Sequence, residues 1–359
     1  MSVPSLNLNT DAVELTAAIC DIESVSGNEK ALADAIHEAL KVYPHLSIDR
    51  DGDAIVARTN LHRAERVVIA GHIDTVPVAN NLPTRRFDID GVDSLWGRGT
   101  VDMKAGVAVQ LKLAAELTEP NADITWIFYD HEEVDASLSG LGRLARNHPE
   151  LLVGKFAVLC EPSSAMIEGG CNGTMRIEVV TRGVKAHSAR PWMGKNAIHG
   201  AADVLNRLSN YEPAELEVDG LVYREALNAV LIRGGIATNV VPDETVVTVN
   251  FRFAPSRSVA EAEAHLRQVF DGHEVRLVDS AAGARPGLDL PEAKAFVAAT
   301  GLAVRPKYGW TDVARFSALG VPAVNFGPAD PSLAHTPHEY VPVAQLRSVL
   351  ASMQAWLSA

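Results

Sequence analysis

Apolar and polar residues follow two different spacings along the first part of the chain. Residues 66–71 and 124–129 form short, nearly continuous apolar runs, which is the pattern of strands buried on both faces. Residues 104–117 and 138–148 instead carry apolar side chains at helical spacing. Strands that alternate with helices predict an α/β domain with a mostly parallel sheet and helices on both of its faces.

Two helices are expected before this alternation begins. The first covers residues 11–21. Ser26 is followed by Glu29 three positions later, which is the spacing of a capping box. This pair predicts the start of a second helix that runs to about Leu40.

The pattern changes after the glycine-rich residues 169–173. The next segment reads strand, helix, strand, strand, helix, strand, which is the order of a ferredoxin-like α+β module. A second loose stretch precedes the return of the α/β pattern. We therefore predict an α/β domain in two parts, residues 1–173 and 287–359, interrupted by a smaller inserted domain over 174–286.

The charge balance narrows the range of partners. The chain has 32 Lys and Arg against 45 Asp and Glu, a net charge of −13, and no run of basic residues. Nucleic acids and anionic membranes are therefore not expected to bind. Its three cysteines are isolated, and we find neither a signal segment nor an apolar stretch near the ~18 residues of a membrane span. These features predict a cytoplasmic protein.

Residues that can bind a metal follow several of the predicted strands. They are two histidines and five carboxylates: His72, Asp74, Asp102, Glu132, Glu133, Glu161 and His335. Nitrogen and oxygen ligands of this kind suit one or two divalent ions. Each residue alone also fits a surface or helix-capping role. Because ligand sites gather at the carboxyl edge of an open α/β sheet, their shared position favours a metal site.

The segment WGRGTVDMKAG needs a separate interpretation. Gly97 and Gly99 suggest a dinucleotide-binding loop, but Asp102 stands where the third glycine of that motif belongs, and no clear strand precedes it. We reject that hypothesis. We expect the two glycines to bend the backbone so that Asp102 points inward ahead of a helix that begins at Lys104.

The segments GHIDTVP, GRGTVDMKAG, HEEVD and CEP, in this order and spacing, resemble the M20 family of di-zinc metallopeptidases and deacylases. The resemblance covers essentially the whole chain. It implies a metallohydrolase that cleaves a linear amide with two zinc ions, which cobalt or manganese can replace. It also implies that the inserted domain is a lid and dimerisation domain, and that the two flanking parts form the catalytic domain.

The resemblance assigns roles to the candidate ligands. It gives His72, Asp102 and Glu161 to one zinc ion, and Asp102, Glu133 and His335 to the other, so that Asp102 is shared. Asp74 would orient the imidazole of His72, and Glu132 would act as the general base. The choice of Glu133 over Glu132 as ligand comes from the family alone.

Further roles fall on the insert and the residues after it. The family places a histidine at His187, contributed by the partner subunit, to stabilise the oxyanion, which implies a homodimer. Substrate-binding positions match Asn239, Arg252, Gly309 and Thr311; a surface ion pair for the arginine and a helix cap for the threonine are the simpler explanations. His131 replaces a frequent aspartate, and could either tune its neighbour Glu132 or compete for metal.

The sequence as a whole is most similar to the succinyl-diaminopimelate desuccinylases of this family. It implies hydrolysis of N-succinyl-LL-2,6-diaminopimelate to succinate and LL-2,6-diaminopimelate, a step of lysine and diaminopimelate biosynthesis. The alternatives are an acetylornithine deacetylase or another N-acyl amino acid hydrolase, and then an aminopeptidase or dipeptidase. A non-catalytic, metal-bearing binding protein is the alternative from a different class.

Overall fold

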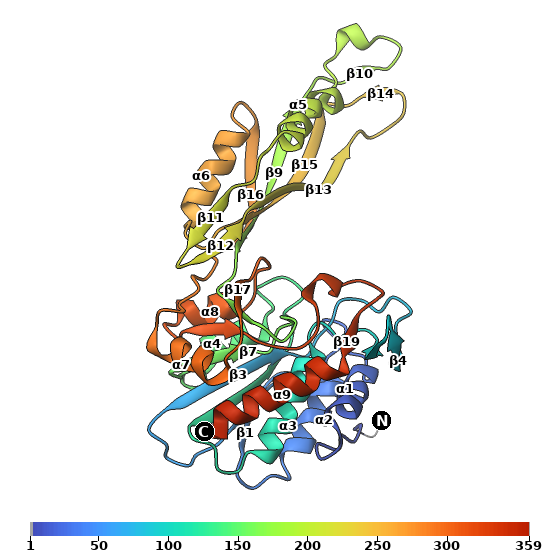
Figure 1. Ribbon diagram of the computed structural model, residues 1–359. Helices are drawn as coiled ribbons and strands as arrows, with labels where there is room; N and C mark the ends of the chain where they lie inside the picture. The colour runs from blue at the N-terminus through green and yellow to red at the C-terminus, as the bar shows by residue number, and fades with distance from the viewer. Residues whose placement is uncertain (1–2, 359) are drawn as a thin grey trace. The chain divides into compact units, whose positions relative to one another are not determined.

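The computed structural model describes residues 3–358, which form two compact units (Figure 1). The second unit comprises Gly170–Pro286 and Pro306–Ala314, and the rest of the described chain belongs to the first. An insert interrupts an α/β unit, as the sequence pattern suggests. Residues 306–314 belong to the second unit, however, whereas the sequence analysis assigned them to the catalytic part.

The first unit is built on a large, mainly parallel sheet. Its strand order is β1-β2-β6-β3-β7-β18-β8-β17, with β6, β3, β7 and β18 parallel to one another. The strands are β1 (Ser47–Asp51), β2 (Ala54–Arg58), β3 (Arg66–His72), β6 (Asp123–Tyr129), β7 (Phe156–Leu159), β8 (Ile167–Gly169), β17 (Val304–Pro306) and β18 (Ala323–Asn325). Every residue of β6 and β7 is buried, which explains their largely apolar sequences.

Helices cover this sheet, and α1, α2, α3 and α9 lie side by side in one layer (Figure 1). The helices of this unit are α1 (Ala12–Asp21), α2 (Lys30–Leu40), α3 (Lys104–Glu116), α4 (Gly140–Asn147), η1 (Pro149–Leu151), α7 (Pro291–Thr300), η3 (Pro331–Leu333), α9 (Val343–Ser358) and, from Arg315 on, α8 (Val313–Ala318). No helix of residues 3–358 is long and apolar enough to cross a membrane. The predicted α/β class is confirmed.

Two glycines let α3 approach the sheet closely. A Cβ at Gly106 of α3 would lie 2.0 Å from the carbonyl oxygen of Cys160, just after β7. A Cβ at Gly71 in β3 would lie 2.2 Å from the side-chain amide nitrogen of Gln110. Such distances leave room only for a hydrogen atom. The start of α3 therefore lies against the end of β3, where the site begins.

A small second sheet joins distant parts of the first unit. It consists of β4 (Arg85–Ile89), β5 (Val92–Trp96) and β19 (Tyr340–Pro342), with β5 in the middle. Tyr340 pairs with Trp96 in this sheet. The pairing brings the residues just after His335 to the start of the glycine loop that leads to Asp102. The sequence analysis missed this sheet, since its strands are short and partly exposed.

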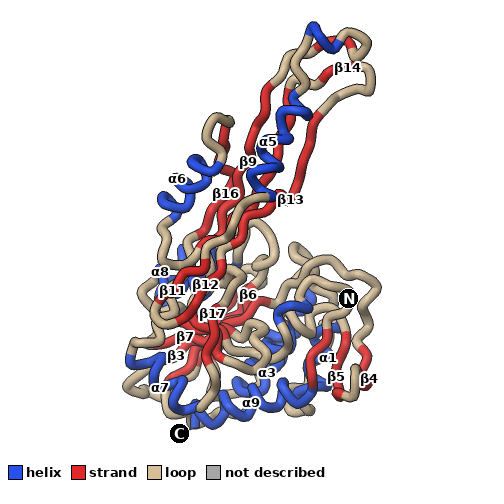
Figure 2. The backbone as a smooth tube through the Cα atoms, turned by 45° about the horizontal axis from the view of Figure 1, so that its top comes forward, coloured by secondary structure: helices blue, strands red, loops and turns tan. Residues whose placement is uncertain are grey.

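The second unit has the ferredoxin-like arrangement predicted for the insert. Its sheet has the order β13-β15-β9-β16, and the four strands run side by side (Figure 2). The elements are β9 (Gly173–Arg182), β10 (Ala186–His187), η2 (Pro191–Met193), α5 (Ala197–Ser209), β11 (Glu215–Val218), β12 (Leu221–Arg224), β13 (Ala226–Gly234), β14 (Val240–Val241), β15 (Glu244–Phe253), α6 (Val259–Val269) and β16 (Glu274–Ala281). Apolar residues of β9 and β15 pack beneath α5 and α6 as this unit's own core.

The predicted capping box before α2 is wrong. Helix α2 begins at Lys30, and no side chain caps its amino terminus. The hydroxyl of Ser26 instead donates to the Oδ2 of Asp74 over 2.7 Å, and Oε1 of Glu29 accepts from the amide of His131 at 3.2 Å. Both side chains serve the loops around the site, because a buried carboxylate gains more from such a donor than a solvated helix end does.

Candidate metal centre

Three of the five predicted ligands sit at the carboxyl ends of three adjacent strands. β6, β3 and β7 are neighbours and run parallel, so their carboxyl ends meet at one edge. His72 is the last residue of β3, Glu133 comes four residues after β6, and Glu161 comes two residues after β7. Strand order alone therefore brings residues from three separate segments to one edge of the sheet.

His72 is held between two aspartates. Its Nε2 lies 3.0 Å from Oδ1 of Asp102, and its Nδ1 lies 3.1 Å from the carbonyl oxygen of Asp74 and 3.3 Å from that residue's Oδ1. The side chains of His72 and Asp74 are buried, whereas that of Asp102 keeps a small exposed area. Asp102 reaches this position one turn after Gly99, whose φ of +83° is the bend expected from the sequence.

Asp102 also contacts His335, which lies near the carboxyl terminus. Nε2 of His335 lies 3.3 Å from Oδ2 of Asp102 and 3.0 Å from Oε1 of Glu133. The ligand atoms of His72, Asp102 and Glu133 all lie within 4.8 Å of one another. The two oxygens of one carboxylate thus face two different imidazoles, which is the arrangement required of a shared ligand.

Asp74 organises the loop that carries the two glutamates. Its Oδ1 accepts from the backbone amide of Glu132 at 3.0 Å, and its Oδ2 accepts from that of Glu133 at 3.1 Å. The hydroxyl of Ser26 binds the same Oδ2. One buried carboxylate therefore fixes the His72 ring and the backbone of both glutamates.

The electrostatics of the group suit a cation. Burial alone lowers the pKa of the His72 imidazole, but the carboxylates of Asp102 and Asp74 outweigh it and hold that pKa well above its usual range. Hydrogen bonds to Asp102 and Glu133 raise the pKa of His335 to about 10. Burial opposes ionisation of Asp102, yet the two imidazoles hold its pKa below the ordinary value. The site concentrates negative charge that protons neutralise when no metal is bound.

These residues fit divalent ions of the zinc type. The donors are imidazole nitrogens and carboxylate oxygens, and the geometry brings three of them within the span of one ion. The buried Asp74 oriented on the far side of His72 is the outer partner that metal-binding imidazoles usually have. The individual ligand assignments stay predictions.

The predicted substrate residues belong to the second unit. His187 lies in β10 and pairs with Val240 of β14, and the carbonyl of Asn239 accepts from the Ser188 amide at 2.9 Å. Arg252 lies next to the carboxyl end of β15. Gly309 and Thr311 lie in the segment 306–314 of the same unit, and the side chain of Thr311 is buried. Their roles stay predictions.

Two pairs of residues beside the site were missed or given another role by the sequence analysis. The Ser26–Glu29 pair had a visible signal that we interpreted as a helix cap. Arg98 and Glu339 form a buried ion pair beside the site, and no local pattern connects residues so far apart. His131, whose role was left open, places its Nδ1 2.7 Å from Oδ2 of Asp130 and 3.3 Å from Oε1 of Glu29. The ring thus binds two carboxylates outside the predicted ligand set.

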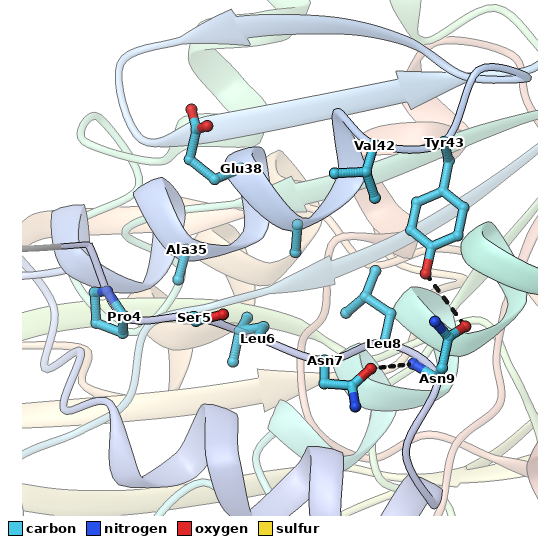
Figure 3. A pocket seen from close by; sticks show the side chains of 11 residues that line it. Pro4, Ser5, Leu6, Asn7, Leu8, Asn9, Ala35, Glu38, Val42 and Tyr43 are labelled. Carbon is cyan, nitrogen blue, oxygen red and sulfur yellow. Dashed lines mark hydrogen bonds between the residues drawn. The ribbon is translucent and has the colours of Figure 1, made fainter.

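A pocket elsewhere in the first unit takes no part in this site. It has a volume of about 230 Å³ and lies between residues 4–9 and helix α2 (Figure 3). Its lining includes Val42 and Tyr43 but none of the candidate ligands. The candidate ligands therefore lie outside this pocket, at the edge of the sheet.

Comparison with known proteins decides the family. Residues 68–359 match peptidase family M20/M25/M40. The chain belongs to this family. The resemblance stated from the sequence motifs is thereby confirmed, and the M20 chain is a metal-dependent hydrolase of amide bonds.

Close relatives and solved structures agree with this placement. The M20 chain is 51% identical to the DapE protein of Mycobacterium tuberculosis, named as a succinyl-diaminopimelate desuccinylase, over 98% of this chain and 99% of the relative. It is 45% identical to succinyl-diaminopimelate desuccinylase of Corynebacterium glutamicum, over 99% and 98% of the two chains. A tripeptidase from Staphylococcus aureus shares the fold with a TM-score of 0.78, 20% identity and 98% coverage of both chains.

Zinc binding to the metal-free M20 chain should release protons at pH 7. The pKa of His335 lies near 10, so its imidazole is protonated at pH 7 and zinc must displace that proton. Apparent zinc affinity should therefore rise between pH 6 and pH 8. Calorimetric titrations in buffers of different ionisation enthalpy give the number of protons released, and His335→Ala should release fewer. Binding without proton release would contradict the assignment of this imidazole.

Proposed function

We propose that the chain is a succinyl-diaminopimelate desuccinylase, which hydrolyses N-succinyl-LL-2,6-diaminopimelate to succinate and LL-2,6-diaminopimelate. The observation that carries the chemistry is the contact of one carboxylate, that of Asp102, with both His72 and His335. The substrate is supported by relatives of that name at 51% and 45% identity across nearly the whole chain.

The proposed cofactor is a pair of zinc ions, which Co²⁺ can replace. His72, Asp102 and Glu161 would hold one ion, and Asp102, Glu133 and His335 the other. When bound, zinc supplies an activated water and polarises the amide carbonyl. The buried position of Asp74 against the His72 ring supports its role as the residue that orients this ligand.

Glu132 is the proposed general base. Its amide is anchored to Oδ1 of Asp74, and its neighbour Glu133 is anchored to the other oxygen. The two successive side chains can thus take different directions, one toward the ligands and one toward the attacking water. Glu132 would take a proton from that water and deliver it to the leaving amine nitrogen.

His187 is the proposed oxyanion donor. Its Nδ1 accepts a hydrogen bond from the amide of Ala189 at 3.0 Å. This contact favours the neutral tautomer with the proton on Nε2, which leaves Nε2–H as the group that donates to an oxyanion. Arg252, Asn239, Gly309 and Thr311 are the proposed substrate contacts, with the arginine suited to a carboxylate.

The positions of His187 and Arg252 within the second unit support a homodimer. His187 lies beside β14, before β15 begins, and Arg252 lies eight residues into β15. At ~3.3 Å per residue the two are separated by about 26 Å, so one substrate is not expected to span both in one copy. A site that uses both residues takes one of them from a partner subunit.

An exposed edge strand supports the same assembly. β13 is at the edge of the second unit's sheet and exposes Val230, Leu231 and Ile232, the last two by 66% and 54%. A long apolar edge strand left in water promotes aggregation. Pairing with a second copy would cover it. A cytoplasmic location is supported by the three free, buried cysteines.

The proposed function predicts a particular substrate preference. Zinc-loaded protein should hydrolyse N-succinyl-LL-2,6-diaminopimelate much faster than N-acetylornithine, N-acetylmethionine or a dipeptide, and a chelator should abolish the activity. Glu132→Gln separates zinc binding from catalysis. It should keep its zinc content and lose turnover by roughly 10²–10⁴-fold, because the amide cannot accept the proton. Succinate release and bound zinc are both measured.

Other outcomes of this panel separate the alternatives. Preference for N-acetylornithine would retain the metal chemistry and reject the proposed substrate. Silence on all four compounds with zinc bound would favour a binding protein. Near-normal turnover of Glu132→Gln would show that another residue is the base.

The role of His187 across the dimer predicts complementation. His187→Ala and Glu132→Gln homodimers should each be nearly inactive. In a mixed dimer, the intact Glu132 of one chain meets the intact His187 of the other, so one site of two should work. Random mixing should restore about one quarter of wild-type turnover. A mixture of His187→Ala with the double variant is the control, and no recovery in the first mixture would contradict a role across subunits.

A further inference from the structure

Arg98 and Glu339 form a buried ion pair next to the candidate metal centre. Their side chains are 3% and 0% exposed, although the two residues are far apart in sequence. Nη1 of Arg98 donates to Oε1 of Glu339 and also to the carbonyl oxygen of Thr336 at 3.3 Å. A pair so removed from water depends on hydrogen bonds to every available oxygen.

The Glu339 carboxylate accepts hydrogen bonds from two different segments of the chain. Its Oε2 accepts from the amide of Gly99 at 2.8 Å, and its Oε1 accepts from the amide of His335 at 3.2 Å. Its backbone carbonyl also accepts from the amide of Gly97 at 3.0 Å. One side chain therefore ties the glycine loop that leads to Asp102 to the backbone of His335.

His335 has a particular need for such support. It is a non-glycine residue with a φ of +65°, a conformation that persists only where its surroundings impose it. Its side chain is 54% exposed, so packing does little to hold the ring. The hydrogen bond from its amide to Glu339 is a direct restraint on this backbone.

We propose that Arg98 and Glu339 are positioning residues for the metal centre. The pair holds the backbone of His335 and the loop before Asp102, so that the imidazole and the shared carboxylate meet at ligand distance. The inference rests on the proposed ligation by Asp102 and His335. Loss of the pair should weaken most the zinc ion held by His335, because that ion depends on both His335 and the Asp102 loop, whereas the other ion keeps His72 and Glu161.

Zinc titration of the metal-free, full-length protein tests this proposal. Glu339→Gln should weaken the second zinc by roughly 10–100-fold, as expected when an outer partner of a ligand is lost. The first zinc should weaken much less, because only one of its three proposed ligands, Asp102, follows a loop that Glu339 holds. His335→Ala serves as the reference for loss of the second site.

Glu225→Gln is the matched control for loss of a buried ion pair. Oε1 of Glu225 accepts from Nε of Arg257 at 2.7 Å and from the amide of Ala254 at 3.0 Å, and the carboxylate is fully buried in the second unit. This variant should lower the thermal unfolding midpoint while both zinc affinities stay at wild-type values. A merely structural role for Glu339 would give the same result.

Glu339→Asp keeps the test decisive if Glu339→Gln fails to fold. It retains the charge opposite Arg98, but the shorter side chain cannot reach both Gly99 and His335, so the second zinc should again weaken. Wild-type zinc affinity in a folded Glu339 variant, with a weakened His335→Ala, would overturn the positioning role alone. An unchanged His335→Ala would overturn the metal assignment and this proposal with it.

Discussion

The site depends on the carboxylate of Asp102, whose two oxygens face two histidines from distant parts of the chain. His72 belongs to a central strand and His335 to a loop near the carboxyl terminus, and they approach Asp102 to 3.0 Å and 3.3 Å. Without a counter-charge, so many carboxylates at one sheet edge would repel one another. Cations resolve that repulsion, as protons on the imidazoles or as divalent metal ions.

Backbone amides and buried side chains hold this arrangement in place. The Asp74 carboxylate accepts hydrogen bonds from the backbone amides of Glu132 and Glu133. The Glu339 carboxylate accepts hydrogen bonds from those of Gly99 and His335. Each carboxylate thus fixes the backbone conformation of loops that carry candidate ligands. Such support lets a site built on irregular backbone keep the geometry that metal binding requires.

Sequence patterns were sufficient for the fold class, and they singled out His72, Asp102, Glu133 and His335, which the structure brings together. Buried parallel strands have nearly continuous apolar sequences, as in 66–71, and the candidate ligands follow strands whose order the α/β pattern constrains. The patterns failed where long-range contacts decide the role of a side chain or the pairing of a strand. Ser26 and Glu29 have the spacing of a helix cap but bind Asp74 and the amide of His131, since tertiary hydrogen bonds outweigh a local preference. No local sequence pattern connects Arg98 with Glu339, or β5 with β19.

The most direct test of the account is the location of zinc in crystals of the protein by anomalous scattering at the zinc absorption edge. The account predicts two peaks, one on each side of the Asp102 carboxylate, the first beside His72 and the second beside His335. A single peak that Asp102 does not contact, or zinc bound away from this sheet edge, would contradict it.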